Sequence, residues 1–153
     1  MEEQILDTWR INNRIDLYVL DAIEPEALSG ALIPRGRRVG DIFNHINTVR
    51  LMWLKVSAPD LFATLKKIEK DDAVDKELLR SSLEASGAAM EELLRRGLET
   101  GRIKGFKPHP VAFLGYITAH DSYHLGEIGI LLNQSGHPLD KKVAYGMWEW
   151  GTR

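Results

Sequence analysis

The chain has 153 residues, a length typical of one domain with a substantial hydrophobic core. Its formal net charge of −2 gives no overall attraction to nucleic acid or acidic membranes, and no apolar run is long enough to cross a bilayer. The absence of cysteine excludes a disulfide, a cysteine nucleophile and a cysteine-bound zinc ion, and it is typical of a protein from the reducing cytoplasm.

Residues 3–24 show the periodicity of an amphipathic helix, and the acidic start MEEQILDTWR is unlike a signal peptide. Two polar residues, Asn12 and Asp16, lie within the main apolar stripe of this helix. We favour the interpretation that this stripe drifts to the helix edge and that both side chains are solvated. The alternative is that they line a pocket. The apolar members of the stripe are Ile5, Trp9, Val19 and Ile23.

Residues 25–39 form a loop rich in proline and glycine, and the loop carries Arg35, Arg37 and Arg38. Three arginines could dock an anionic group of a substrate. Such a cluster is more often a solvated loop, and that is the interpretation we adopt here.

Residues 40–56 predict a second helix, with Asp41 placed to cap or favour its N-terminus. His45 lies beside the apolar stripe of this helix and is expected to face inward. Arg50 and Lys55 lie further round the helix, and we expect both to meet water. The apolar stripe consists of Ile42, Ile46, Val49, Trp53 and Val56.

Residues 57–72 form a second connection, with a short turn near Leu61–Leu65. We predict that Asp72 caps a third helix, that Asp75 occupies its third position, and that this helix runs to about residue 98. The third helix contributes no imidazole, and Gly101 and Gly105 separate it from the next element. Its inward face is predicted to contain Leu79, Leu83, Ser86, Met90, Leu93 and Gly97.

The stretch from His109 to Gly136 predicts one long helix with sharp ends. Pro110 suits the first turn of this helix, Gly136 suits a left-handed C-terminal position, and Pro138 follows. His109 and His137 flank the helix and are predicted to be surface or capping residues. One face of the helix carries two imidazoles and a carboxylate among mostly apolar side chains: Phe113, Ile117, His120, His124, Glu127, Leu131 and Gln134.

The spacing of the inward histidines predicts a metal site. His120 and His124 lie one helical turn apart, so both rings can point at one atom, and His45 is a third inward imidazole. Three separate core histidines would each need a hydrogen-bond partner, whereas one ion satisfies all three. We therefore predict a transition-metal ion bound by His45, His120 and His124, with zinc, nickel, iron and copper all suited to imidazole ligands.

Four amphipathic helices without a strand pattern predict an all-α four-helix bundle that forms one domain over residues 1–153. The connections are longer than is usual in bundles and could cross over the bundle, so a simple up-down-up-down order is not assumed. Residues 138–153 are too apolar for a free tail, because they include Tyr145, Met147, Trp148 and Trp150. We expect this segment to fold back over the bundle or to pack against a second subunit.

Three segments, VGDIFNHINTVRLMWL, ITAHDSYHLGEIGILL and VAYGMWEWG, resemble the DinB/YfiT-like family, whose members are regarded as metalloenzymes. The resemblance covers almost the whole chain, and its strongest motif is the histidine triad carried here by His45, His120 and His124. It implies a four-helix bundle with long connections, a divalent metal and frequently a homodimer. The family often continues Arg-Gly-Gln-Ile after the last histidine, whereas this chain has Leu-Gly-Glu-Ile, which places a carboxylate at Glu127.

Three neutral histidines leave a metal ion with its full charge and with open positions, a pattern typical of catalytic sites. By resemblance, the ion would activate a low-molecular-weight thiol in a transferase that acts on a small molecule. A metal-dependent hydrolase is the rival enzyme, and a non-enzymatic, metal-stabilised binding or stress-response protein is a third interpretation. Asp121 follows the first histidine where His-Glu-x-x-His proteases have glutamate, so a protease is not expected.

Glu127 is the candidate general base, and we favour a position where it contacts a water molecule at the metal. Three alternatives remain for this carboxylate. It could bind the metal directly, it could hold a ligand histidine by its second nitrogen, or it could lie at a wet pocket rim.

Overall fold

The computed structural model describes residues 1–153 and consists of helices without strands, which confirms the all-α prediction. Four long helices form the bundle: α1 (Glu2–Asp21), α2 (Val39–Ser57), α4 (Lys76–Thr100) and α5 (Pro110–Gln134). The shorter elements are α3 (Pro59–Phe62), α6 (Lys141–Gly146) and two 3-10 turns, η1 (Pro25–Ser29) and η2 (Lys70–Asp72). None of the helices combines the length and hydropathy that a membrane crossing requires.

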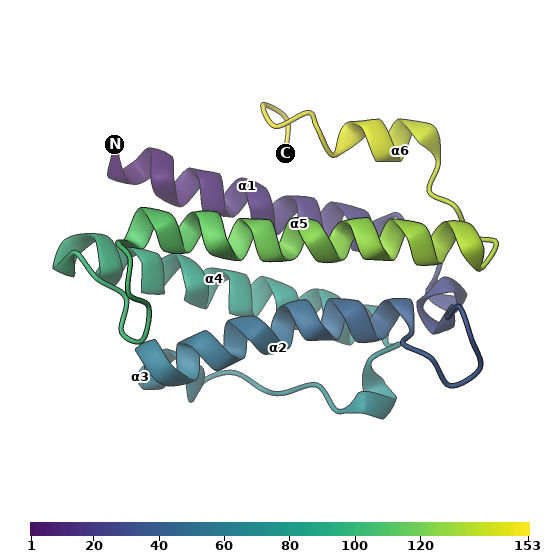
Figure 1. The fold of residues 1–153 in the computed structure, drawn as a ribbon, viewed down its shortest axis with the longest axis horizontal. Coiled ribbons are helices and arrows are strands. Elements are labelled where there is room, and N and C mark those ends of the chain that lie inside the picture. The colour runs from purple at the N-terminus through teal and green to yellow at the C-terminus, as the bar shows by residue number, and fades with distance from the viewer.

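The helices do not follow a simple up-down-up-down order. Helices α1 and α5 run in one direction, and α2 and α4 run in the other (Figure 1). The chain after α3 crosses the length of the bundle before α4 begins, so α2 and α4 are parallel. Helix α1 packs against α4 and α5, and α2 packs against the same two helices. Helices α2 and α5 are therefore neighbours, which brings their facing side chains together.

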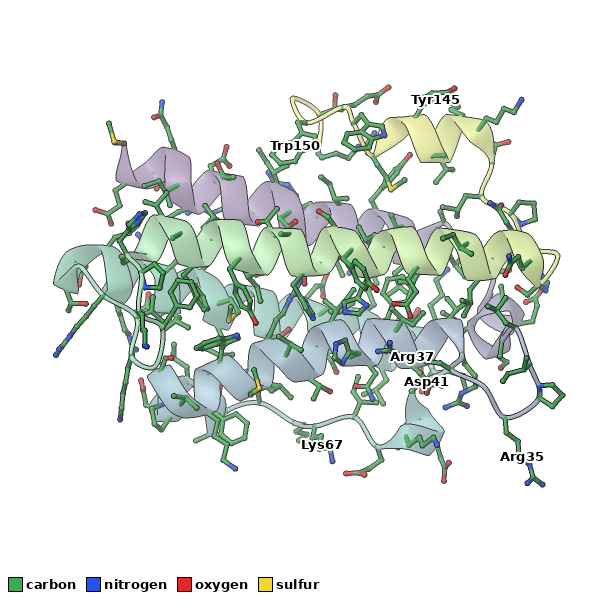
Figure 2. All side chains as sticks on the ribbon, viewed as in Figure 1. Arg35, Arg37, Asp41, Lys67, Tyr145 and Trp150 are labelled. Atoms are coloured by element: carbon green, nitrogen blue, oxygen red, sulfur yellow. The ribbon has the colours of Figure 1, made fainter.

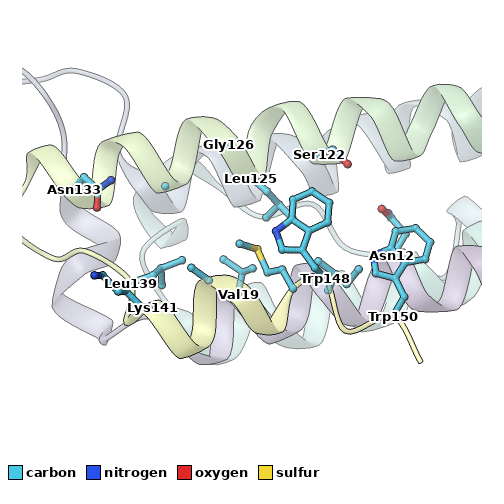
Figure 3. Close-up of a pocket in the computed structure, with 14 residues that line it drawn as sticks. Asn12, Val19, Ser122, Leu125, Gly126, Asn133, Leu139, Lys141, Trp148 and Trp150 are labelled. Carbon is cyan, nitrogen blue, oxygen red and sulfur yellow. The ribbon is translucent and has the colours of Figure 1, made fainter. Parts of the chain in front are cut away.

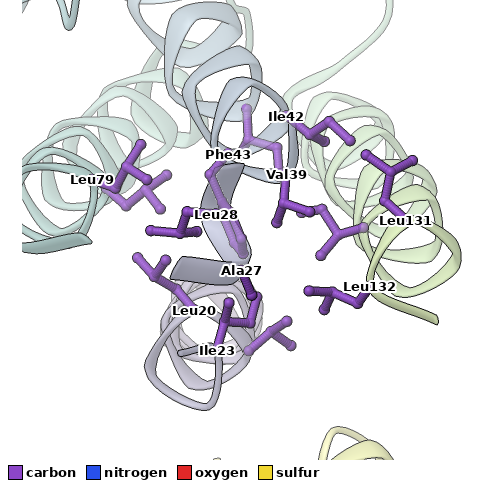
Figure 4. Packing of buried hydrophobic residues seen from close by; sticks show 14 of the residues in the cluster. Leu20, Ile23, Ala27, Leu28, Val39, Ile42, Phe43, Leu79, Leu131 and Leu132 are labelled. Carbon is purple, nitrogen blue, oxygen red and sulfur yellow. The ribbon is translucent and has the colours of Figure 1, made fainter. Parts of the chain in front are cut away.

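The hydrophobic core consists of two clusters with a polar layer between them. In the first cluster, η1 inserts Ala27 and Leu28 among the long helices at one end of the bundle (Figure 4). The second cluster lies at the other end and includes Trp9, Leu54 and Phe113. The polar residues buried between the clusters come from all four long helices: Asn12, Asp16, Asn47, Arg50, Ser86, Asp121 and His124.

The predicted ends of α5 are correct, whereas the predicted start of α4 is wrong. The ring nitrogen Nδ1 of His109 accepts a hydrogen bond from the backbone of Ala112. Gly136 adopts a φ of 83°, and the His137 N–H donates to the Leu132 carbonyl at 2.8 Å, which closes the helix.

The N-cap of α4 is Asp75 and not Asp72 as predicted. The backbone of Asp75 is extended, and its carboxylate accepts from the Leu78 N–H at 3.0 Å. Asp72 lies in η2, where its carbonyl accepts from the Asp75 N–H. Both residues are suitable caps, and the turn between them decides which one starts the helix.

Two residues at the C-terminal ends of the predicted apolar stripes are exposed. Val56 in α2 is 45% exposed, and Gln134 in α5 also faces solvent. Steps that alternate between three and four residues follow a period of 3.5, whereas an α-helix has 3.6 residues per turn, so the stripe rotates by about 20° per seven residues. Over several turns this rotation carries the last members of the stripe out of the core.

The C-terminal segment lies over α1 and α5 (Figure 1). The hydroxyl of Tyr18 in α1 donates to the Val143 carbonyl at 3.2 Å, and the Arg153 guanidinium lies 4.1 Å from the centre of the Tyr18 ring. Gly146 passes so close to the Tyr18 hydroxyl that a Cβ atom would collide with it. The aromatic side chains of Tyr145 and Trp148 remain exposed on this segment.

Candidate metal centre

The three inward histidines meet between α2 and α5. The centre of the His45 ring lies 5.2 Å from that of His120 and 4.6 Å from that of His124, and the latter two are 4.6 Å apart. Each residue offers one ring nitrogen, and these nitrogens all lie within 4.8 Å of one another. The group could therefore hold a metal ion.

One pair of these nitrogens has the spacing of two ligands on one ion. His45 Nε2 and His120 Nε2 are 3.3 Å apart. Two nitrogens bound to tetrahedral zinc at about 2.0–2.1 Å lie about 3.3–3.4 Å from each other. The donor set and this distance both fit a divalent transition metal.

A carboxylate lies beside the Nδ1 nitrogen of each of the two α5 histidines. His124 Nδ1 is 3.0 Å from Glu127 Oε2, and His120 Nδ1 is 3.3 Å from Asp121 Oδ1. A carboxylate at Nδ1 keeps the proton on that nitrogen, orients the ring and leaves Nε2 free to bind a metal. The contact of Glu127 with a second ring nitrogen was one of the alternatives from the sequence, whereas the contact of Asp121 was not predicted.

The surroundings of His45 and His124 favour neutral imidazoles. Burial lowers the pKa of His45, and the nearby His124 and Arg37 lower it further. Burial also lowers the pKa of His124, although its hydrogen bond to Glu127 acts in the opposite direction. Neutral rings are the form that binds metal, because protonation removes the lone pair of the nitrogen.

Two of the three arginines in the loop contact carboxylates. Arg37 Nη1 donates to Glu127 Oε1 at 3.2 Å, and the Arg38 guanidinium donates to both oxygens of Asp41 at 3.0 and 2.8 Å. Arg37 and Asp41 lie at the start of α2, whereas Arg35 points away from the bundle (Figure 2). Arg35 and Arg37 are exposed, as predicted for a solvated loop, although Arg37 also contacts Glu127. Arg38 is half-buried and is paired with Asp41.

A polar pocket of about 470 Å³ borders His45. It has no hydrophobic lining residue, and cationic residues outnumber the single carboxylate in its lining. This lining suits a polar or anionic small molecule that reaches the histidine triad. The residues are Arg35, Gly36, Arg37, Asp41, Asn44, His45, Thr48 and Lys70.

The sequence model of the DinB family matches residues 1–148. The chain belongs to the DinB family. Searches among curated proteins and among solved structures each found no match. The match confirms the resemblance drawn from the sequence motifs, and the structure places the three histidines of the DinB motif together.

In this DinB family chain, Arg50 is fully buried, so the prediction that it meets water is wrong. Its Nη2 donates to Asp16 at 2.5 Å and to Asp121 at 3.0 Å, and its Nη1 donates to Asn13 at 2.6 Å. Asn12 and Asp16 are also buried, which overturns the interpretation that they are solvated. Arg50 on α2 pairs with carboxylates on α1 and α5. The periodicity of a single helix cannot predict a pairing between helices.

The buried network joins all four long helices of the DinB bundle. Arg50 also donates to the Leu83 carbonyl in α4, and its guanidinium lies 4.9 Å from the centre of the Trp9 ring in α1. Asn12 donates to Asp121 Oδ2 at 2.9 Å, while Asp121 Oδ1 contacts His120. The network therefore fixes the carboxylate that orients one of the candidate metal ligands.

The pKa values of the two buried carboxylates shift in opposite directions. Burial raises the pKa of Asp16 well above its usual range, and the charge of Asp121 raises it further. Burial alone would raise the pKa of Asp121 too, but Arg50 and the hydrogen bond with His120 outweigh it, so this pKa is lowered. Asp121 therefore stays ionised beside His120.

Asp121 was not predicted as a partner of the triad, although the sequence of α5 carries a signal for it. Helix α5 has only two charged residues, Asp121 and Glu127, and each lies within three residues of a histidine of the triad. Each carboxylate in a helix with so few charges needs a buried partner or access to water. For Arg50 we find no comparable local signal.

Proposed function

We propose that this DinB family protein is a metal-dependent enzyme that acts on a small polar molecule, with His45, His120 and His124 as metal ligands. The proposal rests on the convergence of three imidazoles, two of which have a carboxylate within hydrogen-bond distance of Nδ1. When bound, a divalent ion on three neutral ligands would act as a Lewis acid toward a water molecule or a thiol. Zinc, nickel and iron all suit this donor set.

Glu127 is the proposed proton acceptor. One of its oxygens holds His124, and the other contacts Arg37, which lines the polar pocket. A carboxylate in that position can accept a proton from a nucleophile that enters the pocket. Arg37 and Lys70 supply positive charge for an anionic group of the substrate.

The histidine triad and Glu127 would suit two enzyme classes, which differ in the nucleophile. The family resemblance favours a low-molecular-weight thiol, which makes the protein a transferase, and a water molecule would make it a hydrolase. A metal-stabilised binding protein without turnover is the non-enzymatic alternative. The homodimer and the cytoplasmic location stay predictions.

The test measures metal content and turnover side by side in the wild type and in Glu127→Gln. Protein purified without a metal-affinity column should contain about one divalent metal ion per chain, and turnover of thiol-transfer or ester substrates should require that ion. Glutamine keeps an oxygen that accepts the His124 Nδ1–H, so the variant should retain its metal. Its turnover should fall by roughly 10²–10⁴ because the proton acceptor is lost.

Glu99→Gln is the matched control, because Glu99 is exposed at the end of α4, and both readouts should match the wild type. Loss of metal in Glu127→Gln would make this residue a ligand. Full turnover in that variant would contradict its role as proton acceptor. Metal-bound wild-type protein without turnover of either substrate class would favour the non-enzymatic alternative.

Acidification should release the metal. Protons compete with the ion for the imidazoles, and the lowered pKa values of His45 and His124 delay this competition to below about pH 6. A lowered histidine pKa in the folded state means that the unfolded chain takes up the proton first, so stability also falls as the pH falls. Metal content and melting temperature, measured from neutral to acidic pH, should decrease together. Full metal retention at about pH 4.5 would argue against an all-histidine site.

A further inference from the structure

A second cavity, of about 420 Å³, lies between α1, α5 and the C-terminal segment (Figure 3). It occupies the flank of α5 opposite the histidine triad, because α5 turns Leu125, Gly126 and Gly129 toward the cavity and His120 and His124 toward α2. The volume falls within the range of about 300–1,000 Å³ that is typical of small-molecule sites. Neither the metal centre nor the proposed reaction uses this space.

The floor of the cavity is kept open by glycine. A Cβ atom added to Gly126 or Gly129 would meet no atom within 4 Å, and neither residue has a positive φ. Glycine inside a helix is less favourable than alanine by about 1 kcal/mol, and the backbone here does not require it. The two glycines therefore leave room above α5 at the expense of helix stability.

The roof of the cavity is aromatic and apolar. Trp148 and Trp150 of the C-terminal segment border the cavity (Figure 3), and Met147 of the same segment also lines it. Trp148 is 77% exposed and Trp150 is 40% exposed, although both contribute large apolar surfaces. A ligand beneath these rings would remove part of that surface from water.

The polar groups of the cavity lie at its two ends. Asn133 and Lys141 are at one end, and Asn12 and Ser122 are at the other (Figure 3). The eleven helical steps from Ser122 to Asn133 correspond to about 16 Å along α5. Lys141 is the one charged residue in the lining. The cavity is thus an elongated apolar slot with a cation at one end.

We propose that this slot binds an elongated apolar carboxylate, such as a medium-chain fatty acid, with its carboxylate at Lys141. The apolar chain then lies over Gly126 and Gly129 and beneath the two tryptophans. A helix of a second copy, which is about 10–12 Å wide with its side chains, is a poorer occupant because the protein's own C-terminal segment covers the slot. A narrow hydrocarbon chain fits beneath that cover.

Calorimetric titration of the protein with decanoate tests the proposal. Binding should be saturable with one decanoate per chain, and EDTA should leave it unchanged because the slot is separate from the histidine triad. Gly126→Leu fills the slot and should weaken binding at least about tenfold, and Gly129→Leu is a second filling variant in case the first is poorly folded. Gly115→Leu is the matched control, because Gly115 also faces open space on α5 but lies outside the cavity.

The charge at Lys141 is tested separately. Lys141→Ala should weaken decanoate binding by about fivefold, the size expected for an exposed ion pair, and should leave binding of uncharged decanol unchanged. The proposal fails if decanoate does not saturate, if both filled variants bind like the wild type, or if EDTA abolishes binding, which would place the carboxylate on the metal. It also fails if light scattering shows that the filled variants, but not Gly115→Leu, dissociate a dimer, since the slot is then an interface between two copies.

Discussion

Replacing His120 with alanine is expected to lower the affinity for the metal by at least about 100-fold, since removal of a group that merely orients a ligand already reduces metal affinity by roughly 10–100-fold. His120 is the proposed ligand whose Nε2 lies 3.3 Å from His45 Nε2 and whose other nitrogen contacts Asp121. Alanine removes both contacts and leaves two imidazoles, which hold a divalent ion poorly. Any turnover that depends on the metal should be lost with it.

The measurement is a zinc titration of metal-free protein together with elemental analysis of the protein as purified. His137→Ala is the matched control, because His137 is exposed beyond the end of α5 and contributes no ring to the triad. Its affinity should equal that of the wild type. Stoichiometric metal in His120→Ala, or an equal loss in both variants, would show that the ion binds elsewhere.

Replacing Arg50 with methionine should destabilise the protein by about 3–5 kcal/mol, the range for a buried ion pair that loses one partner. Methionine is also unbranched and flexible, so it can occupy much of the space of the arginine stem. It leaves Asp16 and Asp121 buried without their cation and removes the hydrogen bonds to Asn13 and Leu83. The free energy of unfolding from urea titration measures the loss.

Lys55→Met controls for the change to methionine on the same helix, because Lys55 is exposed, and it should alter stability by less than about 0.5 kcal/mol. Adding Asp16→Asn to Arg50→Met should recover part of the loss, since it removes one of the two uncompensated carboxylates. A loss below about 1 kcal/mol in Arg50→Met would mean that the network contributes little to folding.

The helices and the histidine triad were predictable from the sequence because they depend on local periodicity. The four-residue step from His120 to His124 places both rings on one face of any helix, and the position of His45 beside Ile42 and Val49 turns it toward the core. The ends of α5 follow from Pro110 and Gly136, whose backbone preferences act within a few residues. None of these features needs knowledge of a neighbouring helix.

The crossover and the N-cap of α4 could not be predicted from the local sequence. The length of the chain between α2 and α4 allows a crossover, but the packing of α4 against both α1 and α2 decides that it occurs. Asp72 and Asp75 both suit an N-cap, and the turn around η2 selects Asp75. In each case the local sequence is compatible with more than one structure, and contacts with other elements determine which one forms.

The buried polar layer was decided by the tertiary structure alone. Asn12, Asp16, Arg50 and Asp121 occupy positions on three separate helices that would each be acceptable at a solvated helix edge. Burial of a charge is unfavourable for one helix and becomes acceptable only when opposite charges from its neighbours arrive within hydrogen-bond distance. The helical period therefore determined which side chains share a face of each helix. The packing of α1, α2, α4 and α5 determined on which of those faces charged side chains are buried and paired.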